Sequence, residues 1–323
     1  MRRYKKTFTL FLLLTMMIPY AKSQELNYSM YHHAPLATNP GIMGTQKEMK
    51  VSLNYRNQAV DIGKNFRSSM LSVFSPVGIR RHTMVVAGSF VNDRASDYLV
   101  TNGGLVALSY SVSLSPKSEL SLGIQFGYFQ RKTAGDFVTE EQFVNGVYDP
   151  TIPSTDVVLN YRKNYSSLSH GLYWQLRDER EDTKAMFGVS VFNATEPELG
   201  FSEHEDRLPL SVKMIAGYTI YSGMKLSVMP TVRWIHQANN NYFNIGSRLS
   251  YELTGRDETR QIALGLWYSP SRVGIASLEF SQPYFTLAVS YDFPVSSKMD
   301  SPQKSVVELA VLYRIKRKSE HAE

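Results

Sequence analysis

Residues 120–128 read Leu-Ser-Leu-Gly-Ile-Gln-Phe-Gly-Tyr, with an apolar side chain at every second position and a small or polar one between. Successive side chains of a β-strand point to opposite faces, so this period of two predicts a strand with one apolar face. The same alternation recurs at 285–293 and 307–315. These three segments are the strongest evidence for an all-β chain.

The alternation extends over most of the chain. Most segments run for roughly ten to fourteen residues, longer than the usual soluble strand of about five or six. They match the roughly 9–11 residues that a tilted strand needs to cross a bilayer. About fourteen such segments are predicted, at 48–57, 65–77, 82–92, 99–113, 118–131, 166–177, 184–194, 208–221, 224–236, 239–253, 259–269, 272–281, 284–294 and 304–316.

The pattern therefore predicts a transmembrane outer-membrane β-barrel of about 14 antiparallel strands, over residues 48–316. A water-soluble β-sandwich is the alternative, although it favours shorter strands. Ser290 is expected to face the lumen. The lipid-facing side chains are expected to include Leu122, Ile124, Phe126, Leu287, Val289, Leu309 and Val311.

The connections between the segments alternate in length. The longest stretches fall at 132–165, 195–207 and 295–303, whereas tight turns lie around 115–117, 222–223 and 282–283. Outer-membrane barrels combine short periplasmic turns with long extracellular loops. The loop that contains Asn145 is therefore predicted to be extracellular. The same holds for the acidic loop with Glu196, Glu198, Glu203, Glu205 and Asp206.

Residues 1–23 have a basic start, an apolar stretch from Phe8 to about Pro19, and Ala21-Lys22-Ser23 before Gln24. This order is typical of a secretory signal peptide cleaved near Ser23-Gln24, although an uncleaved anchor is the alternative. Removing the five basic residues of this segment from the 35 in the chain leaves 30 against 29 acidic residues. The near-neutral remainder gives no indication of nucleic-acid binding, and residues 317–323 form a basic tail.

No catalytic, cofactor or metal site is predicted. The chain has no Cys, which excludes thiol chemistry, cysteine-ligated metals and a lipid-anchored cysteine. His32-His33 would point apart on an extended chain and have no third ligand nearby in the sequence. The acidic loop lacks the regular spacing of a calcium loop, so solvated side chains are expected there. An outer-membrane hydrolase remains an alternative without a recognisable motif.

Residues 24–47 lack the alternation and contain Pro35, Pro40, Gly41 and Gly44. They predict an irregular segment before the first strand, in which Pro40 disfavours helical geometry at Asn39. Such a segment could plug the lumen, dock a periplasmic partner or simply lead into the barrel. We expect it to form part of a docking surface, with a plug as the competing interpretation.

Several motifs resemble the PorP/SprF family of type IX secretion system membrane proteins. The first is an opening tyrosine, a Pro-Leu pair and an Asn-Pro-Ala-Tyr-Ala-Gly run, and the second is Tyr-Arg-x-Gln-Trp. The matching positions are Tyr31, Pro35-Leu36, Asn39 to Gly44, Tyr55-Arg56-Asn57-Gln58, residues 262–268, residues 291–293 and residues 308–315. Gly41, Ala59, the Val306-Val307 pair and the tail from Lys316 depart from the family pattern, as a divergent member would.

The resemblance implies a non-enzymatic outer-membrane component of the type IX secretion machinery of Bacteroidetes, with a role in secretion, gliding or adhesin anchoring. The implied partners are outer-membrane lipid, the periplasmic secretion ring or a peptidoglycan-binding OmpA-like protein, and the C-terminal domain of a secreted cargo. The residues implied in docking or plugging are Tyr31, Pro35, Asn39, Pro40, Gly41, Gly44, Tyr55, Arg56 and Gln58. A porin-like or hydrophobic-substrate transporter with an N-terminal plug is the alternative.

Overall fold

A computed structural model describes most of the chain between residues 27 and 315. The signal peptide expected at 1–23 and the basic tail at 317–323 lie outside the described residues. Within the described part, no helix is long and apolar enough to span a membrane. The described ranges are 27–59, 65–79, 82–95, 98–134, 142–144, 147–149, 151–152, 161–200, 206–254, 259–295 and 305–315.

The described residues form one large antiparallel sheet that contains 14 long strands and the two-residue strand β11, Tyr221–Ser222. All fourteen predicted segments are confirmed as strands, with ends that differ by a few residues. The long strands are β1 Met49–Gln58, β2 Phe66–Ile79, β3 His82–Ala95, β4 Leu99–Ser115, β5 Ser118–Thr133, β8 Arg162–Arg177, β9 Thr183–Phe192, β10 Ser211–Tyr218, β12 Leu226–Gln237, β13 Asn240–Thr254, β14 Thr259–Ser269, β15 Val273–Ser281, β16 Phe285–Pro294 and β17 Val306–Ile315.

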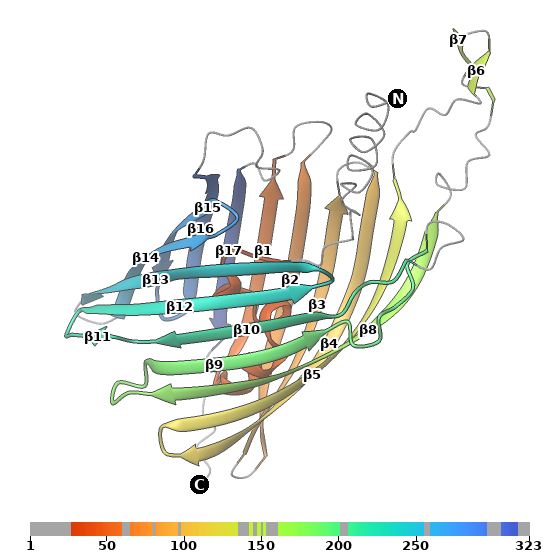
Figure 1. Cartoon of the computed structure of the whole chain (residues 1–323). Helices are drawn as coiled ribbons and strands as arrows, with labels where there is room; N and C mark the ends of the chain where they lie inside the picture. The colour runs from red at the N-terminus through yellow and green to blue at the C-terminus, as the bar shows by residue number, and fades with distance from the viewer. Residues whose placement is uncertain are drawn as a thin grey trace, which may run out of the picture.

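The sheet closes on itself (Figure 1). Each strand pairs with its neighbour along the chain, β10 pairs with β12, and the first strand β1 pairs with the last strand β17. The seam between β1 and β17 runs from Met49 opposite Ile315 to Gln58 opposite Val306. Closure removes the unpaired sheet edges that lipid could not satisfy, so the chain forms a complete β-barrel.

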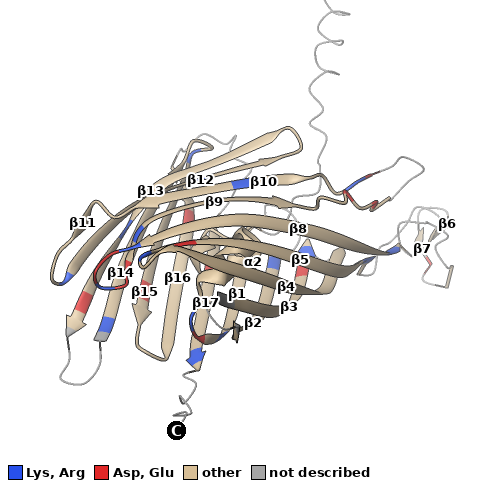
Figure 2. Ribbon diagram, turned by 90° about the horizontal axis from the view of Figure 1, so that it is seen from below, with Lys and Arg blue, Asp and Glu red and all other residues tan. Residues whose placement is uncertain are grey.

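The barrel is apolar outside and mostly small or polar inside. On β5, Leu122, Ile124 and Phe126 are exposed, whereas the alternating Ser121 and Gln125 are buried. On β16, Leu287 and Val289 are exposed while Ser290 is buried, and on β17 Leu309 and Val311 alternate with buried Glu308 and Ala310. The side chains predicted to face lipid therefore lie on the outer face of the barrel, as expected. Figure 2 shows long stretches of strand that carry no charged residue.

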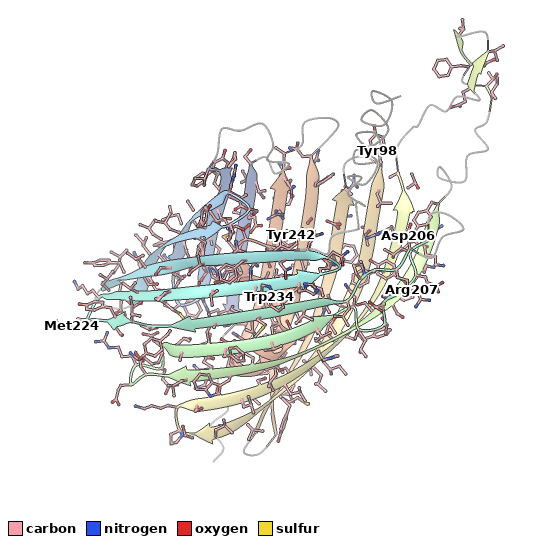
Figure 3. All side chains as sticks on the ribbon, viewed as in Figure 1. Tyr98, Asp206, Arg207, Met224, Trp234 and Tyr242 are labelled. Carbon is pink, nitrogen blue, oxygen red and sulfur yellow. The ribbon has the colours of Figure 1, made fainter. Side chains whose placement is uncertain are left out.

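The two ends of the barrel differ. We call the end formed by the turns at 116–117, 178–182, 223–225 and 282–284 the turn rim, and the opposite end the loop rim. Figure 3 labels Met224 at the turn rim and Asp206 toward the opposite end of β10. Beyond the loop rim, β6 Phe143–Val144 and β7 Val147–Tyr148 form a small separate hairpin.

Residues 27–45, which we call the plug, lie inside the barrel. They form three short helical turns: η1 Tyr31–His33, α2 Pro35–Thr38 and η2 Pro40–Thr45 (Figure 1). Pro35 and Pro40 each begin a turn, where a missing backbone N–H costs nothing. Asn39 adopts an extended backbone with φ −164° and ψ 115°, as expected for a residue before proline. The segment expected to be irregular is thus a chain of short turns.

Candidate functional site

Asn39 fastens the plug to two strands of the barrel wall. Its Nδ2 donates to the carbonyl oxygens of Leu172 on β8, at 2.9 Å, and Val189 on β9, at 3.2 Å. Its Oδ1 accepts a bond of 2.8 Å from the backbone N–H of Gly41, which caps η2. The side chain is buried, so all of these bonds are made away from bulk water. Asn39 therefore acts at once as a helix cap and as a wall anchor.

The wall receives the Asn39-Pro40-Gly41 turn in a recess of three glycines, which we call the glycine recess: Gly123 on β5, Gly171 on β8 and Gly188 on β9. Gly123 and Gly171 are direct partners across the β5–β8 pair. A methyl group added at Gly123 would stand 2.5 Å from the Gly41 nitrogen. One at Gly171 would overlap the Asn39 amide oxygen, and one at Gly188 would stand 2.8 Å from Asn39 Nδ2. The recess therefore requires residues without a Cβ, because the Pro40–Gly41 backbone and the Asn39 side chain occupy that space.

Glu308 holds the start of the plug against the seam of the barrel. Its Oε1 accepts from the Ser29 backbone N–H at 2.8 Å and its Oε2 from Met30 N–H at 2.9 Å. The Ser29 hydroxyl donates to Asp292 Oδ2 at 2.5 Å. Glu308 is 1% exposed, so its carboxylate depends on these donors and on Arg56.

Arg56 lies opposite Glu308 in the β1–β17 register, and its guanidinium forms an ion pair with that carboxylate. It also donates to Ser29 Oγ and to Gln58 Oε1, both at 3.2 Å. The structure thus brings Arg56 to the plug with Gln58 beside it, whereas Tyr55, the residue before Arg56 on β1, is half-buried. Within the Tyr-Arg-x-Gln motif, Arg56 therefore contacts the plug and Gln58 contacts Arg56.

Tyr31 is buried between strands β12 and β14. Its hydroxyl donates to Thr231 Oγ1 at 2.7 Å, and the Trp267 indole donates to the same oxygen at 2.9 Å. The Arg233 guanidinium lies 4.6 Å from the centre of the Tyr31 ring and donates to the Tyr28 carbonyl at 2.7 Å. The cation–π contact and the hydrogen bonds stabilise a cation buried in the lumen, although its Nε has no hydrogen-bond partner in the described part of the structure.

The middle of the plug has one polar and one apolar contact face. Lys213 donates to the Ala37 carbonyl at 2.8 Å, and Ser190 to the Thr38 carbonyl at 2.9 Å. On the other side, Leu36 and Met43 pack into an apolar cluster with residues of β2, β3 and β4. The wall members of this cluster are Met70, Phe74, Val85, Ala87, Val91, Leu105 and Ala107.

The two histidines lie together, and the expectation that their rings point apart is wrong. Because Tyr31–His33 forms a tight turn, the ring centres of His32 and His33 are 4.2 Å apart. Glu279 from β15 approaches both rings, with Oε2 at 3.6 Å from His32 Nε2 and 3.1 Å from His33 Nε2. Within the described residues, this is the one group with the spacing of metal ligands. Glu279 was missed because it lies 246 residues from His33.

The two described glutamates of the acidic loop, Glu196 and Glu198, interact with other groups of the protein. Glu198 forms an ion pair of 3.3 Å with Arg207, and a Glu196 carboxylate oxygen accepts from Leu210 N–H at 3.3 Å. Glu203 and Glu205 lie outside the described residues. The same is true of Asn145 and of most of the loop at 295–303.

A polar cavity of about 570 Å³ extends from the turn rim to Glu279. Its lining is rich in charge of both signs: Glu48, Arg180, Asp182, Lys225, Arg248, Glu252, Glu279 and Arg314. At the rim itself, Lys47 lies 3.0 Å from Glu181, and the hydrogen bond from its ammonium group lowers the pKa of that carboxyl. The lumen is therefore filled at the plug and open to water near the turns.

These features define the class: an outer-membrane β-barrel whose own N-terminal segment fills part of the lumen. The family model of the type IX secretion system membrane protein PorP/SprF matches residues 21–313. The chain belongs to this family, which confirms the resemblance seen in the sequence. It is accordingly an outer-membrane component of the type IX secretion system.

The solved structures that share this fold include the following two. The CymD monoaromatic hydrocarbon channel has 10% sequence identity and a TM-score of 0.54, with 90% of this chain and 94% of that chain covered. The toluene transporter TbuX from Ralstonia pickettii has 8% identity and a TM-score of 0.51, with 88% and 94% covered. No curated protein sequence matches this chain significantly. At such low identity the similarity is one of fold alone.

Proposed function

We propose that this protein is a non-enzymatic, plugged barrel that serves the type IX secretion apparatus as a membrane-embedded binding component. The observation that carries the proposal is the lumen: residues 27–45 occupy it and are tied to the wall by Asn39, Glu308 and Arg233. A filled lumen does not offer a ready path for solutes. Family membership and this filling together support a role in binding rather than in permeation.

We further propose that Tyr31 to Gly44 serves the barrel itself as a plug. Its residues are mostly buried against the wall, which leaves little of their surface for a partner. The docking role expected from the sequence would require the segment to leave the lumen and lose these contacts. The charged turn rim, with Lys47, Lys117, Glu179 and Glu181, is then the surface offered to periplasmic ring components, to an OmpA-like protein or to a cargo C-terminal domain.

Replacing Asn39, Pro40 and Gly41 together by Ala separates the two roles. Heat-modifiable mobility on gels reports the folded barrel, and copurification reports partners. A leaky or destabilised barrel that keeps its partners supports the plug. A stable, closed barrel that loses its partners would establish docking instead.

The proposed membership of a secretion complex is tested by extracting an epitope-tagged chain from the native outer membrane with mild detergent. Copurification of periplasmic ring components or of secreted cargo is the expected result. Recovery of the folded barrel alone, after cross-linking as well as without it, would count against the proposal. We also propose that residues 1–23 are removed on export, which N-terminal sequencing of the same material checks.

Transport of a hydrophobic substrate is the second candidate function. The observation in its favour is the shared fold with a monoaromatic hydrocarbon channel and a toluene transporter. Uptake of toluene into liposomes that contain the purified barrel would support it. Flux equal to that of protein-free liposomes would leave the binding role as the better account.

A further inference from the structure

We propose that His32, His33 and Glu279 form a Zn²⁺ site that joins the plug to the barrel wall. The three ligand atoms, one from each residue, all lie within 4.8 Å of one another. Glu279 Oε2 is 3.1 Å from His33 Nε2 and 3.6 Å from His32 Nε2. Tetrahedral Zn²⁺ with Zn–N and Zn–O bonds near 2.1 Å needs ligand atoms about 3.4 Å apart. Small side-chain movements therefore suffice to bring all three onto one ion.

The wall orients the carboxylate for this role. Glu279 Oε1 accepts from Arg248 Nη2 at 2.7 Å and from Ser281 Oγ at 3.1 Å, which leaves Oε2 directed at the histidines. Arg248 Nε also reaches Oε2, at 3.2 Å. Hydrogen bonds to a metal-binding carboxylate are the usual outer support of such a site. Because Arg248 is a cation, we expect weaker affinity than in a site without a neighbouring positive charge.

The site is accessible to an ion. The polar cavity that reaches from the turn rim is lined by Glu279 and Arg248, and about 25% of the His32 side chain is exposed. Two imidazoles and one carboxylate supply three ligands, and water takes the fourth position, as in zinc sites with an open coordination position. The consequence is structural: η1 of the plug and β15 of the wall become linked through the ion. Zn²⁺ would then hold the plug in place.

The test is a Zn²⁺ titration of the folded full-length barrel in detergent, followed by calorimetry and by Co²⁺ absorption. We expect one equivalent to bind, with a Co²⁺ spectrum typical of four-coordinate nitrogen and oxygen ligands. The double variant His32→Asn and His33→Asn should weaken Zn²⁺ binding by at least about 100-fold. The single variant Glu279→Gln should weaken it by at least as much. A loss of this size exceeds the effect of removing a group that only supports the ligands. His170→Asn is the matched control, because His170 is exposed on the outer face of β8.

Heat-modifiable mobility on gels shows whether each variant is folded. If the histidine variant fails to fold, Glu279→Gln still tests the site, because glutamine preserves the shape of the glutamate side chain. A second measurement is the metal content of the chain isolated from native outer membrane. Binding that is absent, or unchanged in folded Glu279→Gln, would overturn the proposal. Equal loss in His170→Asn would show surface binding and overturn it as well.

Discussion

At the scale of single residues, Asn39 connects the chain's own turn to two strands of the wall. Replacing Asn39 by Ala removes the cap of η2, which is worth about 0.5–2 kcal/mol, together with both wall bonds. We expect Asn39→Asp to be more harmful, although it keeps the capping oxygen, because a carboxylate would face the carbonyls of Leu172 and Val189. Urea unfolding of the two variants measures the difference. An aspartate variant as stable as the wild type would contradict this role for Nδ2.

Arg56 and Glu308 form an ion pair that joins the first strand to the last one. Glu308 also binds the backbone of Ser29 and Met30 at the start of the plug. Removing one partner of a buried ion pair leaves the other charge unpaired and costs about 3–5 kcal/mol. We expect this loss in Arg56→Met and in Glu308→Leu. The double variant should lose clearly less than the sum, because neither the guanidinium nor the Glu308 carboxylate is then left buried without the other. Strictly additive losses in urea titrations would show that the pair does not act as a unit.

At the scale of elements, the glycine recess determines whether the plug can seat. Gly123→Val adds a side chain where the plug backbone lies, and overpacking of this kind costs about 1–3 kcal/mol. Because the strand itself can keep its ladder, we expect the plug to leave while the barrel stays folded. Limited proteolysis should then cleave residues 27–48, and ion conductance in planar bilayers should rise.

The control for the recess is Gly104→Val on β4. An added Cβ at Gly104 meets Ser89 O at 3.6 Å, an ordinary contact, and the residue faces outward. It should leave proteolysis and conductance unchanged. A response equal to that of Gly123→Val would assign the effect to strand distortion rather than to the plug.

At the scale of the whole molecule, the outer face is in contact with lipid and the inner face with water or plug. Ile124→Arg places a charge at mid-depth on the lipid face and should cost about 2–4 kcal/mol of folding free energy in bilayers. Ser227→Arg places the same side chain in the polar cavity and should cost less than about 1 kcal/mol. Folding titrations into lipid vesicles compare the two. Equal losses would contradict the assignment of faces.

The orientation of the barrel in the membrane is a second prediction about the whole molecule. The loop rim is expected outside the cell and the turn rim in the periplasm. Asn145 lies outside the described residues, so Val147 in the β6–β7 hairpin is the better probe, with exposed Met224 at the turn rim as its counterpart. On intact cells an impermeant maleimide should label Val147→Cys and not Met224→Cys. The chain has no native Cys to interfere. The reverse labelling would invert the topology.

The alternation of apolar and polar side chains along the sequence was sufficient to predict the β-barrel. The faces of Leu122, Ile124 and Ser290 were predicted because side chains alternate along any strand, whichever strand lies beside it. The loop lengths and the family motifs added the class of membrane and the secretion system. Each of these signals can be read along the sequence without knowing which distant residues meet in the folded chain.

The interior of the barrel depended on contacts between distant parts of the chain. Arg56 meets Glu308 across 252 residues, Asn39 meets Val189 across 150, and His33 meets Glu279 across 246. Period two says which face a residue takes but not which strand will stand opposite, so Gly123 looked like any small inward residue. The helical turn at Tyr31–His33 likewise overrode the extended geometry expected there. Closure of the sheet is what brought these groups together, because a barrel directs the inner face of every strand onto one enclosed segment.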